Sequence, residues 1–189
     1  MTGPAYRGAL CHSSLAAIAA DAVHGDRVLA AVDPRHLVVI RTASKLAWIP
    51  AVALDDLMAA YLDEAGGAGY LDFWRRYTLG SVDSPLFGAL FNGALRIFGR
   101  SPAGLLKWIG RAWEVTTHEY GHIEVDTDPE VVVIRVLDIP AAGRRPTVPL
   151  STQASVIGVI EFTDRVPLVT AETADFTHTG AYTITARWE

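Results

Sequence analysis

The fold is decided by the stretch Val115-Thr-Thr-His-Glu-Tyr-Gly-His-Ile-Glu-Val125, the turn Asp126-Thr-Asp-Pro129 and the run Val131-Val-Val-Ile-Arg-Val-Leu137. Valine, isoleucine and threonine recur in both arms, and they favour extended chain because their branched Cβ atoms restrict χ1. Aspartate and proline, which lie between the arms, are typical turn residues. We therefore predict a β-hairpin over residues 115–137.

A second hairpin is predicted at the C-terminal end. Apolar and polar side chains alternate from Tyr182 to Trp188, after a turn at Thr179-Gly180, and residues 168–176 supply the other arm. Residues 151–162 between the hairpins are predicted to be helical. The order hairpin, helix, hairpin over residues 114–189 predicts a four-stranded antiparallel sheet.

The preceding part, residues 10–113, carries helical signals. Asp83-Ser84-Pro85 and Ser101-Pro102 each place an N-cap and a first-turn proline before apolar residues at helical spacing. Further helices are expected from Ser13 or Ser14 to His24, from an N-cap at Asp33 and Pro34 to Ile40, from Pro50 to Gly66-Gly67 and from Tyr70 to Gly80. No linker interrupts the chain, so we predict one α+β domain over residues 1–189, with the helical part packed on the sheet.

Composition excludes several classes of function. The 189 residues are half hydrophobic, carry a net charge of −5 and include one cysteine, so a core can form without disulfides. Binding to nucleic acid is not expected because no basic stripe is present. No run reaches the roughly 18 to 20 apolar residues of a membrane span, and the start lacks a signal-peptide pattern. We expect a cytoplasmic protein.

One motif suggests catalysis: His118-Glu119-Tyr120-Gly121-His122 matches the zincin pattern H-E-x-x-H. In a zincin the two histidines bind zinc and the glutamate acts as the base, which requires a helix to bring both rings to one ion. The β-branched residues before the motif and Gly121 within it favour a strand instead. We therefore predict no metal and no catalytic residue; the alternative is a zinc-dependent hydrolase with His118 and His122 as ligands and Glu119 as the base.

Aromatic residues in the helical part are candidates for an apolar ligand pocket between the helices and the sheet. The alternative is that they only pack the core. The candidate residues are Trp74, Tyr77, Phe87, Phe91, Trp108 and Trp113.

Several short segments carry a resemblance to a known family: Trp48-Ile49-Pro50, Arg75-Arg76-Tyr77-Thr-Leu-Gly80, Arg111-Ala-Trp113, Tyr120 and Tyr182-Thr-Ile-Thr-Ala-Arg-Trp188. Through these residues the chain resembles a myxobacterial paralogous family of unknown function, whose members are small single-domain proteins. The order of elements also resembles the wider fold group of haem-nitric-oxide-binding, vinyl-reductase-like and vesicle-tethering domains, which implies a sensor, a ligand binder or an assembly subunit.

The resemblance also bears on cofactors. Haem-binding members of the group hold iron with a histidine on the helix before the first hairpin, and residues 101–113 contain none. Vinyl-reductase-like relatives often carry metal-binding cysteines and histidines near the end of the domain, where this chain has only His178. We therefore expect no cofactor, and haem in particular is not expected.

The predicted function is a non-catalytic ligand-sensing or protein-interaction module in bacterial signalling or regulation. Its partner would be an unknown small apolar ligand or another protein. Because fold relatives commonly pair and the first helices carry much apolar surface, we also expect a homodimer that associates through the helical face.

Overall fold

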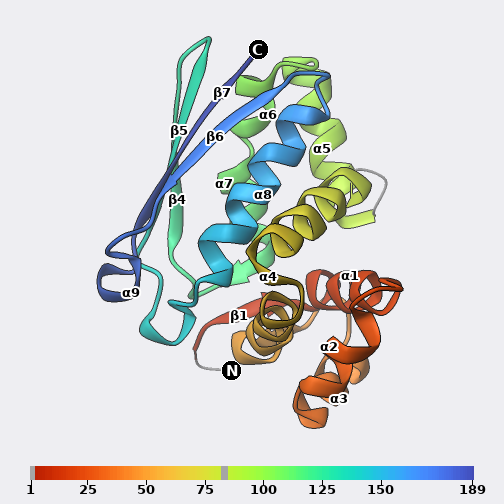
Figure 1. Ribbon diagram of the computed structural model, residues 1–189. Coiled ribbons are helices and arrows are strands. Elements are labelled where there is room, and N and C mark those ends of the chain that lie inside the picture. The colour runs from red at the N-terminus through yellow and green to blue at the C-terminus, as the bar shows by residue number, and fades with distance from the viewer. Residues whose placement is uncertain (1–2, 82–84) are drawn as a thin grey trace.

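The structure, a computed structural model, describes residues 3–81 and 85–189; the side chains of residues 85–87, 89 and 90 lie outside that description. In Figure 1, a four-stranded sheet lies along one side, helix α8 (Thr147–Glu161) packs against it, and the long helix α4 (Ala51–Ser81) packs against α8. The helices of residues 8–42 lie at the lower right of Figure 1, and the turn of the hairpin formed by residues 122–137 lies at the top. A cavity lies between α4, α8 and the helices that precede the sheet.

The other helices are short. They are α1 (Gly8–Ala19), α2 (Gly25–Ala31), α3 (Pro34–Thr42), α5 (Pro85–Phe98), α6 (Pro102–Leu106), α7 (Ile109–Thr116), α9 (Phe176–Thr179) and the 3-10 helix η1 (Ala141–Gly143). The strands are β1 (Ala5–Arg7), β2 (Trp48–Pro50), β3 (Thr117–His118), β4 (His122–Thr127), β5 (Val131–Leu137), β6 (Pro167–Glu172) and β7 (Tyr182–Trp188).

The α+β class is confirmed, and the sheet arrangement differs from the prediction in detail. Four strands form an antiparallel sheet of order β4-β5-β7-β6, in which Ile134 pairs with Ile184. Alternate side chains along β5 and β7 are buried, as the period-2 pattern requires. The prediction missed a second sheet of order β2-β1-β3. Its strands have two or three residues each, too few for an alternating pattern to stand out.

The change from helix to strand falls inside the stretch that was predicted to be extended. Val115 and Thr116 end helix α7 and do not begin a strand. The Thr116 hydroxyl donates a hydrogen bond to the Ala112 carbonyl (2.7 Å), and the Thr117 hydroxyl donates one to the Trp113 carbonyl (2.8 Å). These bonds let β-branched residues close a helix, which their intrinsic preference does not favour.

Several predicted helix ends are displaced. The predicted end at Gly66 is a kink, because Gly66 has φ of 69° and the helix then continues to Ser81. The first predicted helix, from Ser13 or Ser14 to His24, corresponds to α1, which begins earlier, at Gly8, and ends earlier, at Ala19; Val23 lies beyond its end and is exposed. The cap at Asp33 is confirmed, since its carboxylate accepts from the Arg35 amide at 2.8 Å. The predicted cap at residues 83–84 lies outside the described residues.

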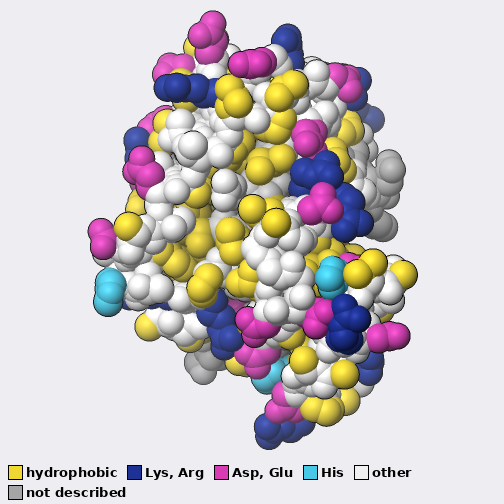
Figure 2. Space-filling view, viewed as in Figure 1, with side chains coloured by type: hydrophobic (Ala, Val, Ile, Leu, Met, Phe, Trp, Pro, Cys, Tyr) yellow, Lys and Arg dark blue, Asp and Glu magenta, His cyan; other side chains and the backbone are white. Residues whose placement is uncertain are grey.

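The core is continuous across the two parts of the chain. Helix α8 contributes Ala154, Val156 and Ile160, while α4 contributes Leu57 and other buried residues. Figure 2 shows hydrophobic side chains along the middle of one face, with acidic and basic side chains mostly around them. No helix in the described part of the chain is both long and apolar enough to cross a membrane.

Candidate functional site

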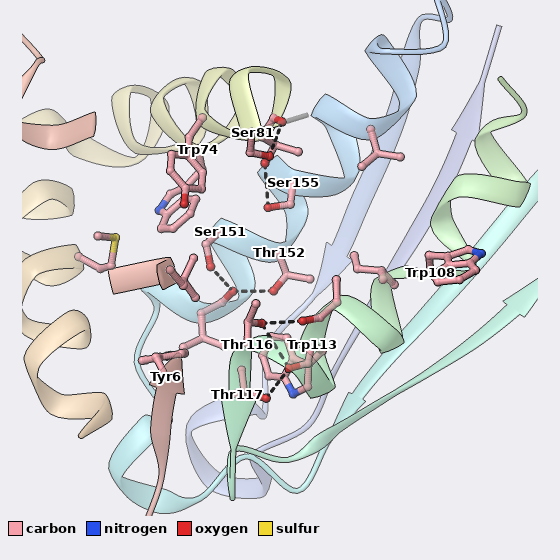
Figure 3. A pocket seen from close by; sticks show the side chains of 18 of the residues that line it. Tyr6, Trp74, Ser81, Trp108, Trp113, Thr116, Thr117, Ser151, Thr152 and Ser155 are labelled. Atoms are coloured by element: carbon pink, nitrogen blue, oxygen red, sulfur yellow. Dashed lines mark hydrogen bonds between the residues drawn. The ribbon is translucent and has the colours of Figure 1, made fainter. Parts of the chain in front are cut away.

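A cavity of about 230 Å³ lies between α4, α8, β1 and the helices α5 to α7. Figure 3 shows the side chains that surround it: Trp74 lies below α4, Tyr6 is on β1, and the hydroxyls of α8 lie near the middle of the view. Its lining is mostly apolar, with contributions such as Leu54, Leu105 and Val159. The cavity is therefore an apolar space at the junction of the helical and sheet parts.

Five of the six aromatic residues predicted for a pocket line this cavity: Trp74, Tyr77, Phe91, Trp108 and Trp113. The Phe87 side chain lies outside the described residues. Trp74 and Tyr77 pack edge to face, with ring centroids 4.9 Å apart, and Phe73 packs against both rings behind them. The geometry thus brings together side chains that lie up to 39 positions apart in the sequence.

A second wall of the cavity carries hydroxyl groups. Ser151, Thr152 and Ser155 project from α8 (Figure 3). Thr78 donates to Ser155 Oγ at 3.2 Å, and the hydroxyls of Ser151 and Thr152 donate to the Val148 carbonyl. Sequence reasoning missed this wall, although serines four residues apart on a predicted helix share one face.

Asp55 is the one charged side chain among the described residues that line the cavity. It is 3 % exposed, and it accepts a hydrogen bond from the Tyr6 hydroxyl at 3.0 Å and from the Tyr120 hydroxyl at 3.2 Å. Burial raises the pKa of Asp55 to about 7, an effect that the two phenols and the nearby Arg145 partly oppose. Burial also raises the pKa of both tyrosines, so their hydroxyls remain donors.

Asp55 was not predicted as a site residue, because a carboxylate on a helix is usually solvated. A signal was present: Asp55 is three residues before Met58 and seven before Leu62, the spacing of one helical face. Met58 is buried and also lines the cavity. An aspartate within an apolar helical face was therefore the pattern to notice.

Two indole groups of the lining have unused donors. The Nε1 atoms of Trp74 and Trp113 are buried and have no hydrogen-bond partner among the described residues. Burial raises the pKa of the Tyr70 hydroxyl, and the neighbouring Trp74 side chain partly opposes that rise. Even so, the Trp74 Nε1 atom does not make a hydrogen bond to that hydroxyl. Buried donors are nearly always paired, so these two are unusual.

The zincin-like motif does not form a metal centre. His118 ends β3 and His122 begins β4, and Glu119 and Gly121 between them have positive φ of 50° and 76°. The rings point to different neighbours: His118 packs against Trp48, and His122 lies 3.4 Å from Asp138. No cluster of three metal-binding side chains occurs in the described part of the chain. The helix required by the zinc-hydrolase alternative is absent from residues 118–122.

No protein-family model matches the chain, and no curated protein is found to be related to it. Solved structures do match. The Fe(II) unliganded H-NOX protein from K. algicida has a TM-score of 0.66 at 9% identity, covering 97% of this chain and 96% of that one. An H-NOX protein from S. oneidensis in the Fe(II)NO ligation state has a TM-score of 0.67 at 11% identity, covering 97% and 99%.

An oxygen-binding H-NOX domain related to soluble guanylate cyclases matches with a TM-score of 0.58 at 11% identity, covering 97% of this chain and 95% of that domain. These likenesses extend over nearly the whole chain, which confirms the predicted resemblance to the haem-nitric-oxide-binding fold. They correct the prediction that no cofactor is to be expected, because the matching structures are those of iron- and haem-containing proteins.

The residues of this chain depart from a haem site in two respects. Haem iron is usually held by histidine, a cysteine thiolate, methionine or tyrosine. Within the described cavity lining there is no histidine or cysteine, and the donors present are Met58 and the phenols of Tyr6, Tyr70 and Tyr77. The same described lining has no arginine or lysine to pair with the propionates. The described lining thus has the apolar character of a haem pocket but offers the iron no histidine or cysteine, in a chain that has the H-NOX fold.

Proposed function

We propose that this chain is a non-catalytic ligand-sensing module that binds an apolar small molecule in the cavity between α4, α8 and β1. The observation that carries the proposal is the cavity itself: a mostly apolar space of about 230 Å³ with one buried carboxyl and a few hydroxyls. Ligand sites commonly combine an apolar lining with a few polar groups that fix orientation. A core that served only for packing would leave no such void, since protein interiors are close-packed.

The size of the cavity limits the ligand. An engineered apolar cavity of roughly 150 Å³ binds benzene, so about 230 Å³ is enough for a somewhat larger ring system. The unpaired Nε1 donors of Trp74 and Trp113 also support a ligand, because an acceptor on that ligand would pair them. A larger ligand such as haem requires the walls to move apart.

The fold relatives give haem a particular place among the candidate ligands. They include proteins described as oxygen-binding and as ligated by NO at Fe(II). In this chain the apolar walls would hold the macrocycle by packing, and the residues described around the cavity include no imidazole for the iron. If the chain binds haem, the absorption spectrum of the complex would therefore indicate which kind of residue ligates the iron, because the spectrum depends on the axial ligand.

We propose that the module acts as one domain in bacterial signalling or regulation, in the cytoplasm, and passes ligand binding to a protein partner or a second copy. Helix α4 is suited to carry the signal, because residues on both sides of its kink at Gly66 line the cavity. Membership of the myxobacterial family of unknown function stays a prediction, as does the homodimer, which light scattering tests.

Native mass spectrometry of the purified chain, together with its absorption spectrum, tests the proposed function. We expect a stoichiometric extra mass, or uptake of an added apolar compound such as 1-methylnaphthalene at one molecule per chain. Haem, added as haemin, is tested in parallel, and a Soret band would identify it as the ligand. If the chain carries no extra mass and takes up neither compound, the proposed function is wrong.

A further inference from the structure

The charge of Asp55 calls for an explanation beyond packing. Asp55 joins three elements, because its carboxylate accepts from Tyr6 on β1 and from Tyr120 in the turn after β3. That connecting role needs only an acceptor, which a neutral asparagine also provides. A carboxylate in the same place adds a desolvation penalty, which Arg145 opposes only in part. The negative charge is therefore unexplained by the connections that Asp55 makes.

Among the residues that the structure describes, no cationic side chain reaches Asp55 from the cavity side. Arg145, the nearest basic influence, does not line the cavity and is paired with Asp56, with Nη1 3.0 Å from Oδ1. His36 Nδ1 also lies 2.8 Å from Asp56 Oδ2. These two groups are thus occupied by the neighbouring carboxylate. The titratable groups that influence Asp55 or are influenced by it are Asp56, Tyr6, Tyr120, Tyr70, Cys11 and Arg145.

Aromatic rings extend from the carboxyl along the cavity. Tyr6 bonds directly to Asp55, and Tyr70 and Trp74 follow on α4 with ring centroids 6.4 Å apart. All three line the cavity. The faces of tyrosine and tryptophan attract cations, most strongly where water is excluded. A buried carboxylate beside aromatic rings is complementary to an organic cation and not to an anion.

We propose that the cavity selects a ligand with an ammonium group bound at Asp55 and an apolar body packed against Tyr6, Tyr70 and Trp74. The proposal rests on the proposed function, because it names the class of ligand for the same cavity. Asp55 then supplies the charge that an apolar void alone would not, and it distinguishes amines from hydrocarbons of the same shape. Its pKa of about 7 adds a pH dependence, since only the ionised carboxylate pairs with an ammonium.

A pair of probes of similar shape tests the proposal: 1-naphthylmethylammonium and 1-methylnaphthalene. Their dissociation constants are measured by isothermal titration at pH 8 for the unmodified chain, Asp55→Asn and Asp56→Asn. A charge-assisted hydrogen bond gives roughly a tenfold to hundredfold gain, so we expect at least about a tenfold preference for the ammonium. Asp55→Asn should lower the preference to less than about threefold, while Asp56→Asn, next to it but outside the cavity, should keep it.

A second measurement does not depend on any variant. The affinity of the unmodified chain for the ammonium should rise between pH 6 and pH 8 as Asp55 ionises, whereas that for 1-methylnaphthalene should stay constant. Equal binding of the two probes, or an unchanged preference in folded Asp55→Asn, would overturn the amine proposal and leave the proposed function standing. Failure of both probes to bind would overturn the amine proposal, and the proposed function would fall with it if the chain also carries no extra mass and takes up no haem.

Discussion

Replacing Asp55 with asparagine should change how the stability of the chain depends on pH. In the folded chain the pKa of Asp55 is raised from 3.8 to about 7 by burial. Between these two values the folded state binds a proton that the unfolded state lacks, so raising the pH favours unfolding. The full difference corresponds to on the order of 4 kcal/mol, of which about 2–3 kcal/mol falls between pH 5 and pH 8.

Asparagine keeps an acceptor for the Tyr6 and Tyr120 hydroxyls and does not titrate. The free energy of unfolding of Asp55→Asn, relative to the unmodified chain, should therefore rise by about 2–3 kcal/mol from pH 5 to pH 8. Urea denaturation at four pH values measures it. Glu130→Gln, an exposed position after β4, serves as the control and should show no such trend. If the free energies of unfolding of Asp55→Asn and of the unmodified chain differ by the same amount at every pH, the reasoning is refuted.

Three further predictions concern the surroundings of the cavity and the zincin-like motif. Tyr6→Phe removes a donor to the buried carboxyl and should lower the free energy of unfolding by about 1.5–3 kcal/mol at pH 8, and by less at pH 5, in the same urea assay. His118→Ala should change the free energy of unfolding by no more than about 0.5 kcal/mol, and hence the thermal midpoint little, because the side chain is 42% exposed. A large loss of stability in this variant, reproduced by adding EDTA to the unmodified chain, would instead indicate a bound metal. Gly121→Ala should lower the free energy of unfolding by about 1–3 kcal/mol, because φ is 76° and a Cβ would lie 2.3 Å from the Leu137 carbonyl oxygen; circular dichroism melting measures the change, and a neutral result would contradict the described turn.

Much of the fold was predictable from local patterns. The turn at 126–129 and the alternation in β7 indicated the strand pairs β4–β5 and β6–β7, and the proline-containing caps located the starts of α3 and α6. The predicted arm over 168–176 was too long, because β6 ends at Glu172 and Phe176–Thr179 forms α9 before β7. The three-stranded sheet was not predictable, since β1 pairs with strands more than 40 residues away. Only tertiary packing decides such short pairings. The boundary at Thr116 was misplaced because side-chain hydrogen bonds outweighed a weak residue preference.

The candidate site was only partly predictable for a related reason. Aromatic residues at helical spacing indicated a cluster, and five of them do line the cavity. The aromatic pattern could not indicate which polar groups face the cavity. The partners that hold Asp55 there come from β1 and from the turn after β3, far from it in the sequence. Those contacts join residues 49 and 65 positions apart. A motif search instead selected His118 and His122, whose spacing has meaning only on a helix.

The central claim, that the cavity is a ligand site, is tested most directly by filling it. Ser155→Phe places a ring inside the cavity from α8, while Gln153→Phe adds the same ring to the same helix outside the lining. Binding of 1-methylnaphthalene to the unmodified chain and both variants is followed by isothermal titration, with circular dichroism to establish folding. We predict that Gln153→Phe binds like the unmodified chain and that folded Ser155→Phe loses at least about tenfold in affinity. Equal affinity for all three proteins would contradict the claim.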